Sequence, residues 1–93
     1  MTYNVTIPQV AEYRISDQYD WQVFGAWRDE HGLYLGTDSG CSCYTPWENY
    51  TDADMTGPLT VEQATEEALS LALDSYYPID LKDFREDFLD ALT

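Results

Sequence analysis

The chain has 93 residues, which is enough for one domain and too few for a second hydrophobic core. Hydrophobic residues make up 44% of it and aromatic residues 15%, so a disordered acidic tail is excluded. Asp and Glu number 18 against 4 Lys and Arg, and the formal net charge of -14 excludes direct binding of nucleic acid or of an anionic membrane through a basic surface.

The first part of the chain is predicted to form strands. Apolar residues alternate with polar ones over residues 2–7 and again over 10–15, which is the period of a half-buried strand. Residues 21–27 have apolar side chains on both faces, which is typical of a strand covered on both sides. A tight hairpin loop at 29–32 leads into a returning strand at 33–35. We expect a small antiparallel sheet of three to four strands, most simply a meander.

The segment 38–58 has no apolar period. It contains Trp47 and both cysteines, and it is about 20 residues long. Loops beyond about 12 to 15 residues are uncommon in compact domains and are often functional or held by specific contacts. Asp38-Ser39-Gly40 within it is interpreted as an Asx turn. We expect an ordered loop in which Trp47 either anchors the loop on the sheet or forms part of a contact surface.

The last part of the chain is predicted to be helical. Thr60 and Gln63 have the spacing of a capping box, and Asp80 is expected to cap a second helix. Apolar residues recur at helical spacing in both segments. The first apolar stripe comprises Val61, Ala64, Ala68 and Leu71, and the second comprises Leu81, Phe84, Phe88 and Leu92. Two short helices with a brief connection should lie antiparallel on one face of the sheet.

These segments predict a single α+β domain. Its parts are a strand-rich region at 1–37, a cysteine-containing loop at 38–58 and a helical pair at 59–93. No apolar run approaches the roughly 20 residues of a transmembrane helix, and no leader pattern opens the chain. Two cysteines are too few for the disulfide framework of a secreted mini-domain. We expect a soluble, unprocessed, cytoplasmic domain without a membrane partner, and the sequence does not indicate its oligomeric state.

Cys41 and Cys43 are the first candidates for chemistry. Two thiolates can bind zinc, but a structural site needs four ligands, which would have to include His31 and a carboxylate such as Asp38. A disulfide between residues two apart is strained and readily reduced. Two free thiols are the simplest interpretation, so no metal or other cofactor is expected. A redox- or metal-dependent module built on Cys41 and Cys43 stays an alternative.

Catalytic motifs are not found in the sequence. The chain has no phosphate-binding loop, no dinucleotide fingerprint and no EF-hand pattern. A nucleophile needs a base beside it, and the single histidine, His31, is expected at a hairpin tip. We therefore expect that the protein is not an enzyme.

The longest motif is Gly-Thr-Asp-Ser-Gly-Cys-Ser-Cys-Tyr-Thr-Pro-Trp-Glu at residues 36–48, preceded by Trp-Arg-Asp at 27–29. It resembles a stretch shared by small acidic actinobacteriophage proteins of unknown function, Gly-Thr-Asp-Ser-Gly-Cys-x-Cys-x-x-Pro-aromatic-Glu. The resemblance covers roughly residues 20–70. Relatives often have Pro where Tyr44 stands here, a departure that changes local rigidity more than chemistry. The resemblance implies a phage origin and a setting in the host cytoplasm, and it implies no activity.

The acidic residues of the two helices form the candidate binding surface, here called the acidic helix face. Its members are Glu62, Glu66, Asp83, Glu86, Asp87 and Asp90. On the second helix these residues lie opposite the apolar stripe, and such a face is also explained by solvation alone. A domain of this size spans roughly 30 Å, a length over which B-DNA carries about 18 phosphate charges. The charge of the chain is of the same order, so DNA mimicry is electrostatically feasible.

Charge and resemblance together predict a non-enzymatic phage accessory protein. We expect it to bind a host protein that is basic or itself binds nucleic acid, with DNA mimicry or inhibition of that factor as one form of the activity. Trp47 and Tyr44 on the loop are the second candidate contact. A structural or virion-associated phage protein is a further alternative beside the redox- or metal-dependent module.

Overall fold

Four strands form a single antiparallel sheet in a computed structural model that describes residues 5–93. The strands are β1 (Gln9–Ser16), β2 (Asp20–Asp29), β3 (Gly32–Cys41) and β4 (Thr56–Leu59), and they pair in the order β1-β2-β3-β4. The helices are α1 (Val61–Leu73) and α2 (Leu81–Asp87), and the 3₁₀ turns are η1 (Asp52–Asp54) and η2 (Leu89–Leu92). The expected α+β fold, with two C-terminal helices after the sheet and loop, is confirmed.

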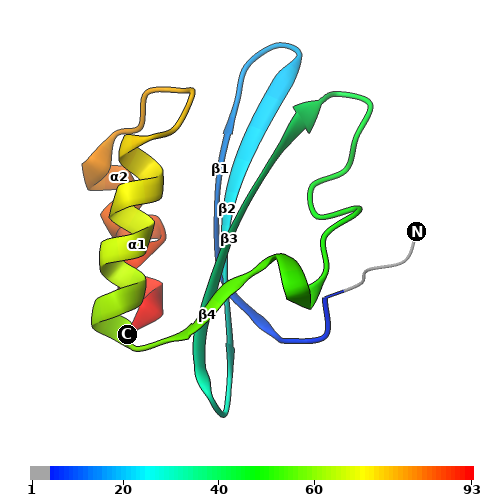
Figure 1. Ribbon diagram of the computed structural model, residues 1–93. Helices are drawn as coiled ribbons and strands as arrows, with labels where there is room; N and C mark the ends of the chain where they lie inside the picture. The colour runs from blue at the N-terminus through cyan, green and yellow to red at the C-terminus, as the bar shows by residue number, and fades with distance from the viewer. Residues whose placement is uncertain (1–4) are drawn as a thin grey trace.

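The sheet has cover on both of its faces (Figure 1). The helices α1 and α2 with η2 lie against one face, and residues 42–55, here called the tryptophan loop, lie over the other. The molecule measures 36 × 33 × 18 Å along its principal axes. Each face of the sheet therefore has a hydrophobic core of its own.

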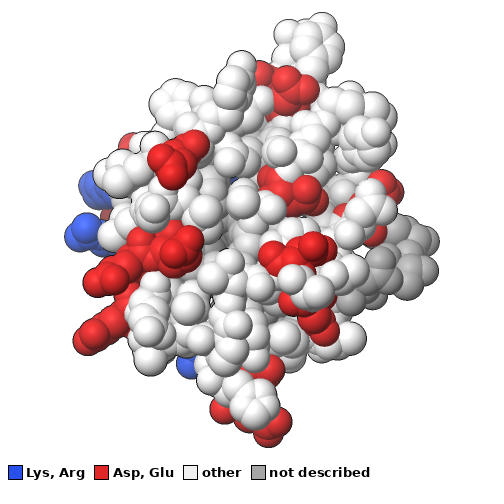
Figure 2. Space-filling model, viewed as in Figure 1, with Lys and Arg blue, Asp and Glu red and all other residues white. Residues whose placement is uncertain are grey.

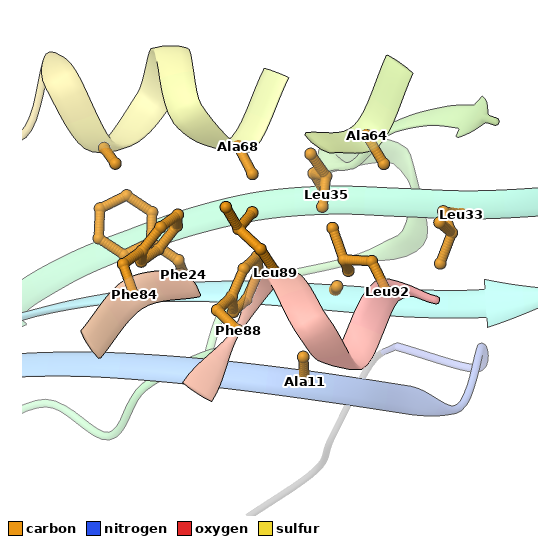
Figure 3. Packing of buried hydrophobic residues seen from close by; sticks show 12 residues of the cluster. Ala11, Phe24, Leu33, Leu35, Ala64, Ala68, Phe84, Phe88, Leu89 and Leu92 are labelled. Atoms are coloured by element: carbon orange, nitrogen blue, oxygen red, sulfur yellow. The ribbon is translucent and has the colours of Figure 1, made fainter. Parts of the chain in front are cut away.

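The helix layer meets the sheet through a core of aliphatic and aromatic side chains (Figure 3). The ring of Phe84 lies at its centre, 5.6 Å from the ring of Phe24 on β2 and 5.1 Å from that of Phe88. The buried residues of α1 are small, which lets the helix approach the sheet closely; they are Ala64, Ala68 and Ala72. Burial of one large apolar side chain contributes roughly 1.5 to 3 kcal/mol, so the α2–η2 segment stabilises the sheet substantially.

The strand β2 contributes to both cores, as its sequence predicts. Trp21, Val23 and Trp27 are at most 4% exposed and belong to the core under the tryptophan loop. Phe24 and Ala26 are equally buried and face the helices. Alternation by two residues sends these two sets to opposite faces, so the prediction of a strand covered on both sides is confirmed.

The N-termini of both helices follow local sequence signals. Gln63 N–H donates to Thr60 Oγ1 over 3.1 Å and the Gln63 side chain accepts from Thr60 N–H, which is the predicted capping box. Asp80 caps α2 as expected.

The two apolar stripes of the helices begin later than predicted. Val61 and Leu81, the first residue of each predicted stripe, are 39% and 46% exposed and do not face the core. Within residues 5–93, no helix has the length and apolar character needed to span a bilayer.

The strand predicted at residues 2–7 is wrong in its described part. Residues 5–7 form no strand, and residues 1–4 lie outside the described part of the chain. The fourth strand of the sheet is instead β4, whose first three residues lie in the segment expected to be a loop and whose last, Leu59, lies in the segment expected to be helical. Its four residues include Gly57 and Pro58. Both residue types are depleted in strands, and proline is confined to edges and strand ends, so local sequence gives no strand signal there.

The strand β3 extends well beyond its expected end, and the Asx turn predicted for residues 38–40 is wrong because these residues pair with β2. The physical reason lies in two glycines that face the tryptophan loop. A Cβ atom at Gly40 would lie 2.8 Å from the ring of Trp21. One at Gly36 would lie 2.0 Å from the Tyr50 hydroxyl oxygen. Aromatic rings from elsewhere occupy these positions, so no apolar period is visible in the sequence.

Candidate functional site

The acidic helix face is accessible along both helices. All six of its side chains are exposed. In the part of the chain that the structure describes, the only ion pair joins His31 Nε2 to Glu30 Oε1 over 3.5 Å, at the hairpin between β2 and β3. No Lys or Arg of residues 5–93 therefore forms an ion pair with the acidic helix face. Its charges act on an approaching cation over about 8 Å at physiological ionic strength.

Four of the six carboxylates form two rows on the helix layer, one on α1 and one on α2. Glu62 and Glu66 lie on α1 opposite its buried alanines, so they face outward. Asp83 and Asp87 lie one turn apart on α2 and turn toward β1. Burial raises the pKa of Tyr13 on β1, and the nearby carboxylates, which include Asp83 and Asp87, raise it further. One row therefore points to solvent from α1, and the other follows the border between α2 and β1.

Negative charge also extends beyond the helices. Figure 2 shows Asp and Glu on the helix side and on the loop side of the same face, whereas the few Lys and Arg atoms in view lie along the edge of the helix side. Two of the four cationic residues, Lys82 and Arg85, belong to α2. The tryptophan loop and the strand beside it contribute Asp38, Glu48, Asp52 and Asp54. A partner that contacts the helices therefore also meets the field of the loop.

Trp47 is the anchor of the tryptophan loop. Its side chain is 4% exposed, and its ring lies edge-on to Trp27 with 5.0 Å between centroids. Trp47 Nε1 donates to Glu12 Oε1 over 2.7 Å, and its backbone N–H donates to Asp38 Oδ2 over 2.9 Å. Its φ of 67° is costly for a residue with a Cβ atom. Of the two roles that the sequence leaves open for Trp47, the structure shows the anchor on the sheet.

Tyr44, the other loop candidate, is exposed at the rim of a groove. Its side chain is 55% exposed. The groove has a volume of about 710 Å³ and runs between β3 and the tryptophan loop. Trp21 and Tyr50 contribute aromatic surface to it, and Asp38 and Glu48 contribute carboxylates. Sequence reasoning missed this groove because its strand wall was expected to be part of the loop.

Tyr50 closes the floor of the groove. Its hydroxyl donates to the carbonyl of Asp54 over 3.1 Å, and the backbone of Thr37 hydrogen bonds to the same oxygen. Burial and the charges of Asp54 and Asp38 raise the pKa of Tyr50 to about 12. The phenol therefore stays neutral well into alkaline pH and is a fixed hydrogen-bonding group beside β3.

Cys41 and Cys43 are free thiols at the end of β3. Cys41 is partly exposed and Cys43 is exposed. Hydrogen bonds from the thiol and the backbone N–H of Cys43 lower the pKa of Cys41, and the same thiol–thiol contact raises the pKa of Cys43. The pair is accessible to soft electrophiles, and Cys41 is the more acidic of the two.

His31 lies at the other end of β3 from these cysteines. The ten residues of β3 separate them by roughly 30 Å, at a rise of about 3.3 Å per residue. His31 therefore does not complete a zinc site with Cys41 and Cys43. No group of three or more His, Cys, Asp or Glu side chains among residues 5–93 is arranged to hold a metal ion.

Comparison with known protein families finds one family that matches nearly the whole chain. A family described as a domain of unknown function (DUF7574) matches residues 2–89. The chain belongs to this family. No curated protein and no solved structure matches it. The family match includes the motif at 36–48, both helices and the groove, and its description carries no activity.

Proposed function

We propose that this DUF7574 chain is a non-enzymatic binding domain that engages a basic surface of a partner protein through the acidic helix face. The observation that carries the proposal is the set of six exposed carboxylates without an ion-pair partner among residues 5–93. Retaining a net charge of -14 costs stability through self-repulsion. Attraction of a cationic partner is a physical benefit that offsets this cost.

The dimensions of the molecule favour a partner that binds nucleic acid. Its longest axis is 36 Å, a length over which B-DNA carries about 21 phosphate charges at one per roughly 1.7 Å. The net charge of the chain is of that order. A protein surface shaped to attract DNA therefore also attracts this domain, and the domain competes with DNA for it.

The resemblance of residues 36–48 to small phage proteins adds a biological setting to this proposal. In that setting the partner is a host protein and the domain acts in the host cytoplasm. Inhibition of a nucleic-acid-binding host factor is then the simplest consequence of binding.

Paired charge reversals test the proposal. Glu86→Lys with Asp87→Lys changes the acidic helix face at the last turn of α2, where cations suit the helix dipole, so folding should be unaffected. Glu30→Lys with Asp74→Lys makes the same change of net charge at exposed positions elsewhere. Capture from host lysate by each immobilised variant, quantified by mass spectrometry, should lose its salt-sensitive partner only with the first pair. Equal capture by both pairs would contradict the proposal.

A further inference from the structure

One edge of β3 is only half covered. β4 pairs with β3 at Leu33 and Leu35. Beyond Leu35, β3 continues to Cys41 with β2 on one side, and no strand within residues 5–93 pairs with its other side. Residues 37–41, here called the free edge, span about 17 Å at about 3.4 Å per residue. An unpaired strand edge is a template for pairing with another chain.

The hydrogen-bonding groups of the free edge face away from β2 at alternate residues. Ser42 N–H donates to the Tyr19 carbonyl over 2.7 Å, on the β2 side. Because residues of an antiparallel strand alternate in direction, Thr37, Ser39 and Cys41 present their N–H and C=O groups to the other side. At Cys41 the carbonyl already accepts from Trp21 Nε1 over 2.8 Å and from Tyr44 N–H over 3.0 Å. The hydrogen-bonding groups that the free edge offers are therefore those of Thr37 and Ser39.

Two N–H groups of the free edge have local partners. The Asp38 carboxylate accepts from Ser39 N–H over 2.9 Å, and the Tyr50 hydroxyl oxygen hydrogen bonds to the backbone of Thr37. Such local caps protect an edge from aggregation and can be exchanged for a better partner. The carbonyl groups of Thr37 and Ser39 face the groove beside them.

The groove gives the free edge a defined opposite wall. The tryptophan loop runs alongside the edge, and the open groove between them has a volume of about 710 Å³, within the range of about 300 to 1,000 Å³ that is usual for ligand sites. Trp47 holds this wall in place through its burial and its bond to Asp38. A strand that enters the groove therefore meets a preformed site.

The negative charge of the groove favours a cationic ligand. Asp38, Glu48 and Asp54 line the groove, and no Lys or Arg does. Tyr44, which is 55% exposed, adds aromatic surface on which a guanidinium group stacks favourably. An extended segment that carries Lys or Arg on alternate residues fits both the edge and its walls.

We propose that an extended, cationic segment of a partner protein binds in this groove as an additional strand on the free edge of β3. Its N–H groups bond the carbonyls of Thr37 and Ser39, and one of its carbonyls accepts from Ser39 N–H in place of the Asp38 carboxylate. Its Arg or Lys side chains reach the carboxylates of the groove. This is strand addition, in which backbone bonds supply affinity and side-chain contacts supply specificity. The site is separate from the acidic helix face and does not depend on the function proposed for that face.

A synthetic peptide tests the inference directly. The probe is a ten-residue peptide in which Arg alternates with Val, and the control is the same peptide N-methylated at its four central residues. N-methylation keeps the charges and removes the backbone donors. In amide NMR titrations, the unmodified peptide should shift residues 37–41 and 44–50, and the N-methylated peptide should bind at least tenfold more weakly.

Variants of the protein complete the test. Ser39→Pro removes an N–H that faces the groove and leaves the β2–β3 ladder intact, so affinity should fall at least tenfold while the remaining amide spectrum stays folded. Glu48→Gln should weaken binding about threefold, whereas Glu86→Gln on α2, with the same change of charge, should have no effect.

Four results would overturn the inference. Equal binding of the two peptides would show attraction by charge without strand addition. Shifts confined to the helices would place the peptide on the acidic helix face instead. No binding at about 1 mM peptide would remove the site altogether. Self-association that Ser39→Pro abolishes, measured by sedimentation, would assign the free edge to a second copy of this chain.

Discussion

Trp47 shows how one side chain orders a segment that has little regular structure. Its ring fills the core beneath the tryptophan loop, and its two N–H groups bond to Glu12 and Asp38, on different strands. Burial of the indole and two charge-assisted hydrogen bonds offset a backbone conformation that costs about 1 to 2 kcal/mol. The loop therefore owes its order to a contact between residues far apart in sequence.

Substitutions at Trp47 should separate packing from hydrogen bonding. Trp47→Phe keeps most of the ring contact and loses the bond to Glu12, so the free energy of unfolding should fall by about 1 to 3 kcal/mol. Trp47→Ala also leaves a cavity and should cost about 3 to 5 kcal/mol. Urea unfolding followed by circular dichroism measures both. Equal losses for the two variants would show that the ring does not pack as described.

The raised pKa of Tyr50 predicts that the protein loses stability at alkaline pH. Its pKa is raised to about 12 in the folded state and is near 10 in the unfolded chain. Between these values the unfolded state releases the proton and the folded state keeps it, so stability is full below pH 10 and falls as pH rises toward 12.

The variant Tyr50→Phe isolates this effect. Its free energy of unfolding should depend less steeply on pH between about 10 and 12 than that of the parent, as measured by urea titrations across this range. Tyr76→Phe is the control, since Tyr76 is 87% exposed. A parent and a Tyr50→Phe variant with the same slope would show that Tyr50 ionises freely in the folded protein.

At the scale of elements, the sequence predicts those whose signals are local. The two-sided pattern of β2, the turn before Gly32 and the capping box at Thr60 all depend on residues within a few positions of one another. The second half of β3 and all of β4 depend on partners distant in sequence. Gly36 and Gly40 have no side chains, so this part of β3 shows no alternation of apolar and polar residues. The rings that cover the two glycines come from other segments.

The same reasoning explains which candidate sites could be predicted. Helical spacing is sufficient to place Asp83 and Asp87 on one side of α2, and the structure shows them there beside β1. The groove is not visible in the sequence because it forms between a strand and a loop that meet only in the folded chain. The sequence predicts one loop over residues 38–58, whereas the fold divides its first part, residues 38–50, into the two opposite walls of the groove.

At the scale of the whole molecule, two modest cores share one sheet. The radius of gyration is 12.7 Å, close to the value of about 12 Å that is expected for this length. Each face of the sheet is buried by one short layer, so neither core is large. A net charge of -14 on a molecule of this size creates a strong electrostatic field. Two small cores leave only a modest free energy of unfolding with which to offset the repulsion. We therefore propose that the function resides in the charged surface, which the two cores support.

Displacement of DNA from the captured host partner tests this central claim most directly. A fluorescent duplex is bound to that partner, and this chain is titrated in at several salt concentrations while anisotropy is followed. We expect the parent to release the duplex, less effectively as salt rises, and we expect displacement by the Glu86→Lys, Asp87→Lys variant to need at least tenfold more protein than displacement by the Glu30→Lys, Asp74→Lys control. A duplex that stays bound while the chain also binds, or equal titrations for the two variants, would contradict it.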